Sequence, residues 1–195
     1  MSARRWALVG LAGTATLGLL LRLSWAGVGG LPLTDHPGWL RHAHSHLGYY
    51  AFIFPGLWWA WRGGWRPTGP LLHVYAVASF ATAVAFALQG YALGSILGST
   101  LVAVVWGVFA WRAGFTRWLR GDWEHAVAPA IVLALCFVPP VAVFTRKDPA
   151  LAQALVRTFL SLLLVGAALP VCVGRGGAPG VLWLPAATLA ALGGG

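Results

Sequence analysis

The sequence predicts an all-α fold, a polytopic bundle of six or seven transmembrane helices with a cytoplasmic N-terminus. Hydrophobic residues make up 59% of the 195 residues and charged residues only 9%, whereas a soluble domain carries about 25% charged residues. The apolar residues gather into runs of about 20, the length at which a helix crosses the hydrocarbon core. Tryptophans stand at the ends of these runs, where indoles anchor helices at headgroup depth.

The apolar runs define the helices in chain order. The predicted spans are residues 6–26, 38–61, 70–92, 95–111, 125–145 and 150–172, with a further stretch at 179–193. The first run resembles a signal peptide, but no A-x-A cleavage site follows it, which favours an uncleaved helix. The last stretch is short and contains Pro185, so it is a short seventh helix or a re-entrant or interfacial tail. The connectors are short, and residues 1–195 are expected to form a single integral membrane domain.

Prolines fall inside two of the predicted helices. Pro55 lies in the second, and Pro129 and the Pro139–Pro140 pair lie in the fifth. Proline lacks a backbone N–H and its ring displaces the carbonyl four residues earlier, so we expect kinks at these positions. Within a membrane, such kinks are tolerated where neighbouring helices satisfy the freed carbonyls.

The distribution of basic residues orients the bundle. With the N-terminus inside, the cytoplasmic segments carry eight basic residues and the outer segments carry four. The inner ones are Arg4, Arg5, Arg62, Arg66, Arg112, Arg117, Arg120 and Arg175, and the outer ones are Arg22, Arg41, Arg146 and Lys147. Because cytoplasmic loops are enriched in Lys and Arg, this bias favours a multi-pass protein of the bacterial inner membrane with its N-terminus in the cytoplasm.

The excess of basic residues, 13 Lys and Arg against 4 Asp and Glu, would indicate nucleic-acid binding in a soluble protein. Here no basic face alternates with base-stacking aromatic residues in a polar context, so nucleic acid is not an expected partner. The expected partners are the lipid bilayer and other membrane subunits or further copies of the chain. Cys136 and Cys172 form no C-x-x-C pair and are expected to be buried as small apolar residues.

One histidine-rich segment carries the candidate chemistry. At the outer mouth of the second helix, within eleven residues, stand His36, His42, His44 and His46. On a helix His42 and His46 share a face, whereas His44 lies about 160° away, so one helix cannot aim all three at one metal ion. Imidazole is the commonest metal ligand in proteins, so the segment predicts a metal or haem site with these four as candidate ligands. The alternative is a wet interfacial patch without a ligand.

Other polar residues are expected at the same depth as the histidines. Gln89 and Tyr91 lie near the outer end of the third span, and Arg157 lies in the outer third of the sixth. A charge at that depth costs roughly 2.5–3.5 kcal/mol, so Arg157 should face the interior and meet a haem propionate, an anion or a carboxylate. The alternative is that it snorkels to the interface. The candidate cofactor-binding residues are thus His42, His44, His46, Gln89, Tyr91 and Arg157.

A second, inner site is a weaker alternative. His73 and His125 begin the third and fifth spans, both on the inner side. They could serve as two axial ligands from facing helices, as around a haem. Histidine is also common at headgroup depth without any ligand, and this interfacial position is the favoured interpretation of the pair.

The string His-Ala-His-Ser-His at 42–46 and the later segment Gln89–Thr100 resemble small haem-copper-oxidase-like membrane proteins of bacteria, including the NnrS-like nitric-oxide-response proteins. The resemblance covers about residues 30–112. It implies that the histidine opening the second helix ligates a haem, a role that falls by position on His44 with His42 beside it. Haem-copper oxidases carry further ligating histidines in later helices, and this chain has none after His125. Reduction of oxygen or nitric oxide by this chain alone is therefore not expected.

These observations favour a protein that binds haem or copper through the outer histidines and acts in electron transfer, metal handling or sensing. The rival hypothesis is a non-catalytic accessory or structural subunit of a larger respiratory or photosynthetic complex. Its histidines would then serve lipid, pigment or subunit contacts. A membrane enzyme with a histidine-bound metal is disfavoured, because only His42 and His46 have the HxxxH spacing of such enzymes.

Overall fold

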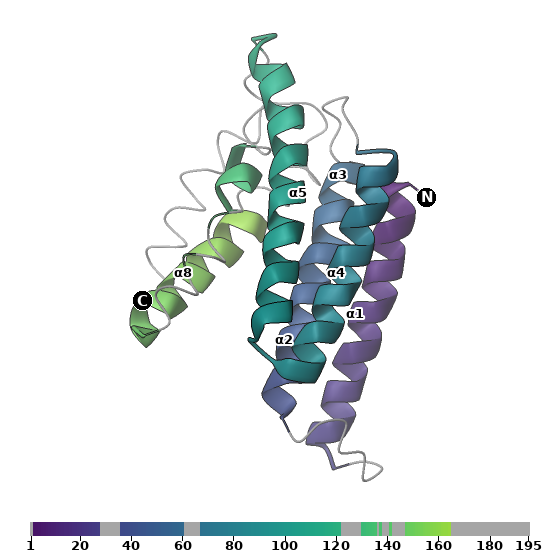
Figure 1. Ribbon diagram of the computed structural model, residues 1–195, viewed down its shortest axis with the longest axis vertical. Coiled ribbons are helices and arrows are strands. Elements are labelled where there is room, and N and C mark those ends of the chain that lie inside the picture. Colours follow the sequence, from purple (N-terminus) through teal and green to yellow (C-terminus); the bar gives the residue numbers. More distant parts are fainter. Residues whose placement is uncertain are drawn as a thin grey trace. The chain divides into compact units, whose positions relative to one another are not determined.

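The computed structural model describes residues 2–27, 36–60, 67–121, 130–135, 137, 141 and 147–164. Every regular element in these ranges is helical, which confirms the all-α class for this part of the chain (Figure 1). In chain order the elements are α1 (Ala3–Trp25), α2 (Pro37–Leu47), the π-helix η2 (Gly48–Ile53), α3 (Phe54–Ala60), α4 (Pro70–Gln89), α5 (Leu93–Trp118) and α8 (Pro149–Ser161).

The chain divides into two compact units according to its internal contacts. The first comprises Met1–Trp59 and Pro67–Val102, and the second comprises Ala60–Arg66 and Ala103–Gly195. The helices α1, α2 and α4 with η2 belong to the first unit, and α8 belongs to the second. The single membrane domain expected over residues 1–195 stays a prediction.

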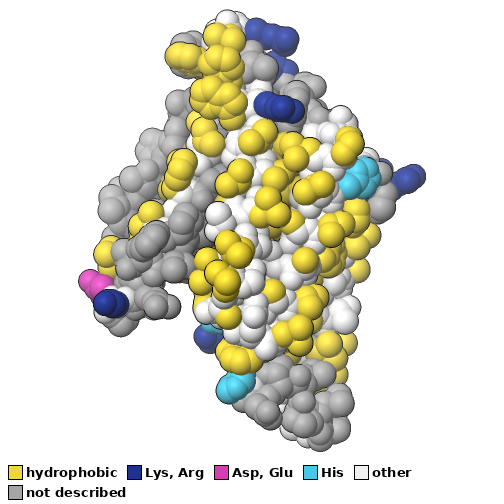
Figure 2. Space-filling model, viewed as in Figure 1, with side chains coloured by type: hydrophobic (Ala, Val, Ile, Leu, Met, Phe, Trp, Pro, Cys, Tyr) yellow, Lys and Arg dark blue, Asp and Glu magenta, His cyan; other side chains and the backbone are white. Residues whose placement is uncertain are grey.

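Three helices are long and apolar enough to cross a membrane: α1, α4 and the Leu93–Phe115 part of α5. Only 17% of the most apolar window of α1 is buried inside the protein, and its Leu19 side chain is 60% exposed. On the face shown in Figure 2, hydrophobic side chains cover the helices, and Lys, Arg and His side chains lie toward helix ends. Exposed apolar surface marks contacts with membrane or with other proteins. The described helices therefore have the length and surface of a membrane protein.

The structure describes some of the predicted spans in full, others in part and one not at all. Spans 6–26, 70–92 and 95–111 correspond to α1, α4 and α5, and span 38–61 corresponds to α2, η2 and α3 in succession. Span 150–172 corresponds to α8, which ends at Ser161. Of span 125–145 the structure describes a helix at 130–135 and two further residues, and the stretch 179–193 lies outside the described residues. The number of passes and the side of the N-terminus stay predictions.

The core of the first unit joins residues from all of its packed helices. Its members are Leu47, Ala51 and Ala83, with Leu17 and Phe80 packed against them.

The guanidinium carbon of Arg4, at the start of α1, lies 5.3 Å from the centroid of the Trp59 ring near the end of α3. The helix from α2 to α3 therefore runs opposite to α1, and α2 begins at the end of the unit where α1 finishes (Figure 1).

Small residues on α1 allow α2 and η2 to approach its backbone closely, as in many membrane helix pairs. A Cβ added at Gly10 would collide with the carbonyl group of Ala51, and one at Gly18 would lie 2.9 Å from the ring of His44. Thr14 lies between these glycines at the same four-residue spacing and contacts the second helix as well. The α1–α2 contact is thus a close packing of backbones along one face of α1.

A π-helix interrupts the second span immediately before the proline that is predicted to kink it. The N–H of Phe54 donates to the carbonyl of Tyr49, five residues back, and the next donor in that pattern, Pro55, has no N–H. The hydroxyl of Tyr75 on α4 donates to the Tyr50 carbonyl instead, with the two oxygens 2.6 Å apart. Both tyrosines are buried, and the loss of a buried hydrogen bond of this kind costs about 1–3 kcal/mol. The bond from α4 therefore stabilises the π segment.

The second unit has a smaller described part. On α5 the side chains of Val105, Trp106, Phe109 and Ala113 are buried. The side chain of Asp148 accepts a hydrogen bond from the N–H of Leu151 at 3.1 Å and so caps the start of α8. An aspartate before a proline is a strong signal for a helix start, and the predicted sixth span does begin here.

Candidate functional site

The histidines of α2 divide between two faces of the helix, as helical spacing requires. The rings of His42 and His46 face α4 and contact Phe86 there. The ring of His44 faces α1, with its Nδ1 3.0 Å from the carbonyl oxygen of Thr14. The three histidines therefore belong to two different sites.

Five rings form what we term the histidine–aromatic cluster: His42, His46, Tyr50, Phe86 and Tyr91. The His46 ring stacks on Phe86, with centroids 4.0 Å apart and planes at 28°. Tyr91 meets His42 edge-on at 4.7 Å and Phe86 at 5.0 Å, and Tyr50 meets His46 at 5.5 Å. All of these are favourable distances for ring pairs. The cluster thus joins α2, η2, α4 and the turn after α4 at one end of the first unit.

A backbone hydrogen bond fixes the chemistry of His46. Its Nδ1 lies 2.9 Å from the carbonyl oxygen of His42, one turn earlier. A carbonyl only accepts, so Nδ1 carries the proton and donates, and Nε2 of the neutral ring keeps its lone pair. Metal-binding histidines are commonly oriented by such a bond from the other ring nitrogen. His46 is therefore a positioned imidazole whose Nε2 is a potential ligand.

The described residues contain no group of three or more His, Cys, Asp or Glu side chains placed to hold a metal ion. What the cluster offers is a pair, because the ring centroids of His42 and His46 lie 6.5 Å apart. Two imidazoles bound to one ion, each through a metal–nitrogen bond of about 2.0–2.1 Å, have centroids at most about 6.5 Å apart, and only when they lie on opposite sides of the ion. The pair stands at this limit, so binding one ion with both rings on the same side of it requires the rings to move closer.

His44, to which the resemblance assigns a haem, is engaged with α1. Its Nδ1–H donates to the Thr14 carbonyl, and Gly18 leaves the space in which its ring lies. Any side chain at position 18 would displace that ring. In this arrangement His44 links two helices, and its role as a haem ligand stays a prediction of the resemblance.

The turn between α4 and α5 covers the cluster and gives Gln89 a local function. In the amide orientation that satisfies its hydrogen bonds, the Gln89 side-chain oxygen accepts from the N–H groups of Gly94 and Ser95 at 3.3 and 3.2 Å. The Ser95 hydroxyl donates to the carbonyl of Gly90 at 2.6 Å. The sequence predicts a cofactor-binding role for Gln89, whereas the structure places its amide at the start of α5, where it caps the helix.

The indole of Trp39 places the start of α2 beside this turn. Gly90 has φ +60°, a conformation that glycine adopts readily, and a Cβ there would also collide with the Trp39 indole. The ring of His36 lies 4.1 Å from the Trp39 ring by centroids. His36 therefore packs at the first turn of α2, beside Trp39 and six residues before the first histidine of the cluster.

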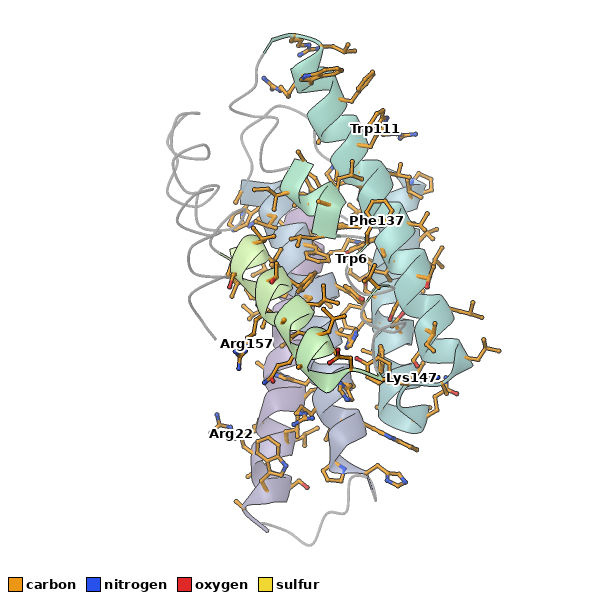
Figure 3. The ribbon with its side chains drawn as sticks, turned by 90° about the vertical axis from the view of Figure 1, so that its left-hand side faces the viewer. Trp6, Arg22, Trp111, Phe137, Lys147 and Arg157 are labelled. Carbon is orange, nitrogen blue, oxygen red and sulfur yellow. The ribbon has the colours of Figure 1, made fainter. Side chains whose placement is uncertain are left out.

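Arg157, the charge expected to converge on the histidines, lies on α8 in the second unit. Its side chain is exposed and projects from α8 in Figure 3. The cluster lies in the first unit, so the expected convergence of Arg157 with His42 and Tyr91 stays a prediction.

The two inner histidines have different outcomes. His73 lies in the first turn of α4, exposed, with Nδ1 3.0 Å from the Gly69 carbonyl and its ring centroid 6.2 Å from that of Trp6. His125 lies outside the described residues. The pairing of His73 with His125 in a second site therefore stays a prediction.

Comparisons with protein-family models, with curated proteins and with solved structures found no match. The resemblance to haem-copper-oxidase-like proteins thus rests on its short motifs, and the function rests on the geometry of the cluster.

Sequence reasoning missed two members of the cluster. Tyr50 stands four residues after His46, so the same helical spacing that pairs His42 with His46 would have included it. Phe86 had no comparable signal, because it is one of many apolar residues on α4. Its contact with His46 depends on how α2 and α4 align along their axes, and that alignment cannot be inferred from a single sequence.

Proposed function

We propose that this chain is a multi-pass protein of the bacterial inner membrane that binds copper through His42 and His46, in electron transfer, metal handling or sensing. The observation that carries the proposal is the hydrogen-bonded His46 ring one turn from His42 on the same face of α2. Its Nε2 keeps the lone pair that a metal ion requires. The ring of Tyr91 packs edge-on against His42, so a residue with a phenol group, a further candidate donor, belongs to the same cluster.

The available donors favour copper over other divalent ions. The described residues of the first unit include no Cys, Asp or Glu, so the ligands are imidazole nitrogens and a phenol. For a given set of nitrogen and oxygen donors, affinity among first-row divalent ions peaks at Cu²⁺. Tyr91 is 50% exposed, so the cluster lies next to the surface of the unit on the Tyr91 side.

Haem fits the same residues less well. A haem ligated by His46 lies beyond Nε2 with its plane across the imidazole, and it needs a much larger flat space there than a single ion does. The rings of Tyr91 and His42 lie 6.1 and 6.5 Å from that of His46, so a macrocycle requires more of the cluster to move than an ion does. The copper site therefore demands the smaller rearrangement.

Copper titration of the detergent-purified chain tests the proposal. Wild-type protein should bind one Cu²⁺ per chain, detected by elemental analysis and electron paramagnetic resonance with imidazole nitrogen couplings. His46→Phe keeps a ring against Phe86 and removes the ligand nitrogen. It should weaken copper binding at least about tenfold, since the loss of a residue that only orients a metal ligand already costs about that much. His44→Ala, on the opposite face of the same helix, is the matched control and should bind as the wild type does.

Two results would contradict the copper proposal. Loss of copper in His44→Ala with retention in His46→Phe would place the ligand on the α1 face. A haem α-band in the reduced-minus-oxidised spectrum of the purified protein, lost in His44→Ala, would favour the haem ligand that the resemblance implies.

The accessory-subunit hypothesis has one specific observation in its favour. Several histidines at α2 already have a packing role: His44 on α1, His46 on Phe86 and His36 on Trp39. If no metal or haem is found and the chain co-purifies with a stoichiometric membrane partner, these packing roles become the full explanation of the histidines.

A further inference from the structure

The end of the first unit opposite the histidine–aromatic cluster is basic and aromatic. It carries Arg4 and Arg5 at the start of α1 and His73 at the start of α4, all three exposed. Trp6 links the two helices there, with its ring 6.2 Å from that of His73. Tryptophan and arginine side chains at the ends of membrane helices commonly lie at the depth of the lipid headgroups.

Arg4 is held in place by a ring. Its guanidinium carbon lies 5.3 Å from the centroid of Trp59, within the range of a cation–π contact. Trp59 is itself 47% exposed, so it lies at the surface of the unit. The contact restricts the arginine side chain and still leaves the edge of the guanidinium available to an anion, which it can bind through two parallel hydrogen bonds.

Arg4 and Arg5 have no acidic neighbour among the described residues of their own unit. The four acidic residues of the chain are Asp35, Asp122, Glu124 and Asp148, and none of them is among those described residues. Asp35 stands in the connector between α1 and α2, which follows the other end of α1. Among the described residues of the unit, Arg4 and Arg5 therefore have no carboxylate with which to pair.

We infer that Arg4 and Arg5, with Trp59 holding Arg4, bind the phosphate of an anionic phospholipid headgroup. A lipid is the fitting source of the anion because α1 is long and apolar enough to cross a membrane, and its first turn then lies at headgroup depth. Each basic residue near the membrane surface raises the binding affinity for anionic lipid by a factor of about five. The site is independent of the copper proposal, since it lies at the opposite end of the unit.

Native mass spectrometry of the full-length chain in detergent tests this inference. The probes are phosphatidylglycerol and phosphatidylcholine with identical acyl chains, which differ in net headgroup charge. The wild type should retain phosphatidylglycerol in preference. The double variant Arg4→Gln/Arg5→Gln should lower that retention roughly 25-fold, about fivefold for each arginine.

The matched control is Arg22→Gln/Arg41→Gln, which removes the same charge from the other end of the unit and should keep the preference. Trp59→Leu leaves both arginines in place and frees Arg4, so a several-fold loss is expected even if the double variant fails to fold. Equal retention of the two lipids by the wild type, an equal loss in the Arg22→Gln/Arg41→Gln control, or undiminished retention in Trp59→Leu would overturn the inference. Displacement of the lipid by millimolar inorganic phosphate would do so too, because it would indicate a simple anion site.

Discussion

The two faces of α2 differ in what holds them to their neighbours. Against α1 the contact is made of small residues and backbone: Gly10 lies on the Ala51 carbonyl, and His44 donates to the Thr14 carbonyl. Against α4 the contact is made of large rings, with His46 on Phe86 and Tyr91 on His42. At Gly10 the α1 face leaves no space for an added atom, whereas ring contacts can be exchanged for others of similar shape.

This difference explains how one short histidine-rich string can serve two purposes. The imidazole on the close-packed face acts as a hydrogen-bond link between helices, and its replacement should change stability. The imidazoles on the ring-packed face can rotate to meet a ligand, and their replacement should change binding. Substitutions on the two faces should therefore have opposite signatures.

The largest effect is expected on the α1 face from Gly10→Ala. The new Cβ collides with backbone atoms of Ala51 that cannot move aside, so the variant should lose about 3 kcal/mol or more of stability. Gly13→Ala is the matched control, because its Cβ would lie 3.1 Å from the flexible Leu47 side chain and alanine favours the helix by about 1 kcal/mol. Thermal unfolding in detergent should separate the two, and equal melting temperatures would refute backbone packing on this face.

Tyr75→Phe should have the next largest effect, on the α4 side. It removes the hydroxyl that donates to the buried Tyr50 carbonyl and should cost about 1–3 kcal/mol. The control is Ser79→Ala, whose hydroxyl donates to the Tyr75 carbonyl within the same helix and whose loss should matter less. If both variants unfold at the same temperature, the cross-helix bond does not stabilise the π segment.

His44→Ala against His46→Phe is the direct comparison of the two faces. His44→Ala loses its bond to Thr14 and should lower stability by about 1 kcal/mol, measured by chemical or thermal unfolding. His46→Phe retains a ring against Phe86 and should unfold within experimental error of the wild type. A larger loss in His46→Phe than in His44→Ala would contradict the assignment of linking and ligand-binding roles.

Gln89→Ala is expected to have the smallest effect. It removes the oxygen that accepts from the N–H groups of Gly94 and Ser95, a capping loss of about 0.5–1 kcal/mol. Gln89→Glu should match or exceed the wild type in stability, because a carboxylate is favoured at a helix N-terminus. Copper affinity should stay the same in both variants. A marked drop in either would indicate that Gln89 takes part in copper binding.

The fold was predictable as far as it depends on apolar length. Helices α1, α4 and α5 are long apolar runs, and the chain reveals them directly. The π-helix was not predictable in detail, because Pro55 indicates a distortion but the donor that compensates it, Tyr75, comes from another helix. Local sequence signals a break, and only the packed structure shows how the break is satisfied.

The candidate site was predictable in its α2 histidines and in Tyr91, which was expected at their depth and meets His42 at 4.7 Å. The four-residue spacing by itself separates His42 and His46 from His44. The partners of each face, Phe86 and Thr14, depend on how neighbouring helices align along their axes, and that alignment is set by side-chain volumes such as those of Gly10 and Gly18. The contacts of Gln89 were not predictable for a related reason, since they are made to the backbone of the next helix, and its cofactor-binding role stays a prediction.

The replacement of the N–H that Pro55 lacks by the hydroxyl of Tyr75 has an evolutionary consequence. A proline that deprives a carbonyl of its backbone donor makes a distant hydroxyl necessary, and the hydroxyl in turn makes the proline tolerable. The two positions should therefore change together among relatives of this chain, with phenylalanine accepted at 75 chiefly where an ordinary residue stands at 55. Such a pair would let the register of α2 against α4 be recognised in sequences whose histidines have been lost.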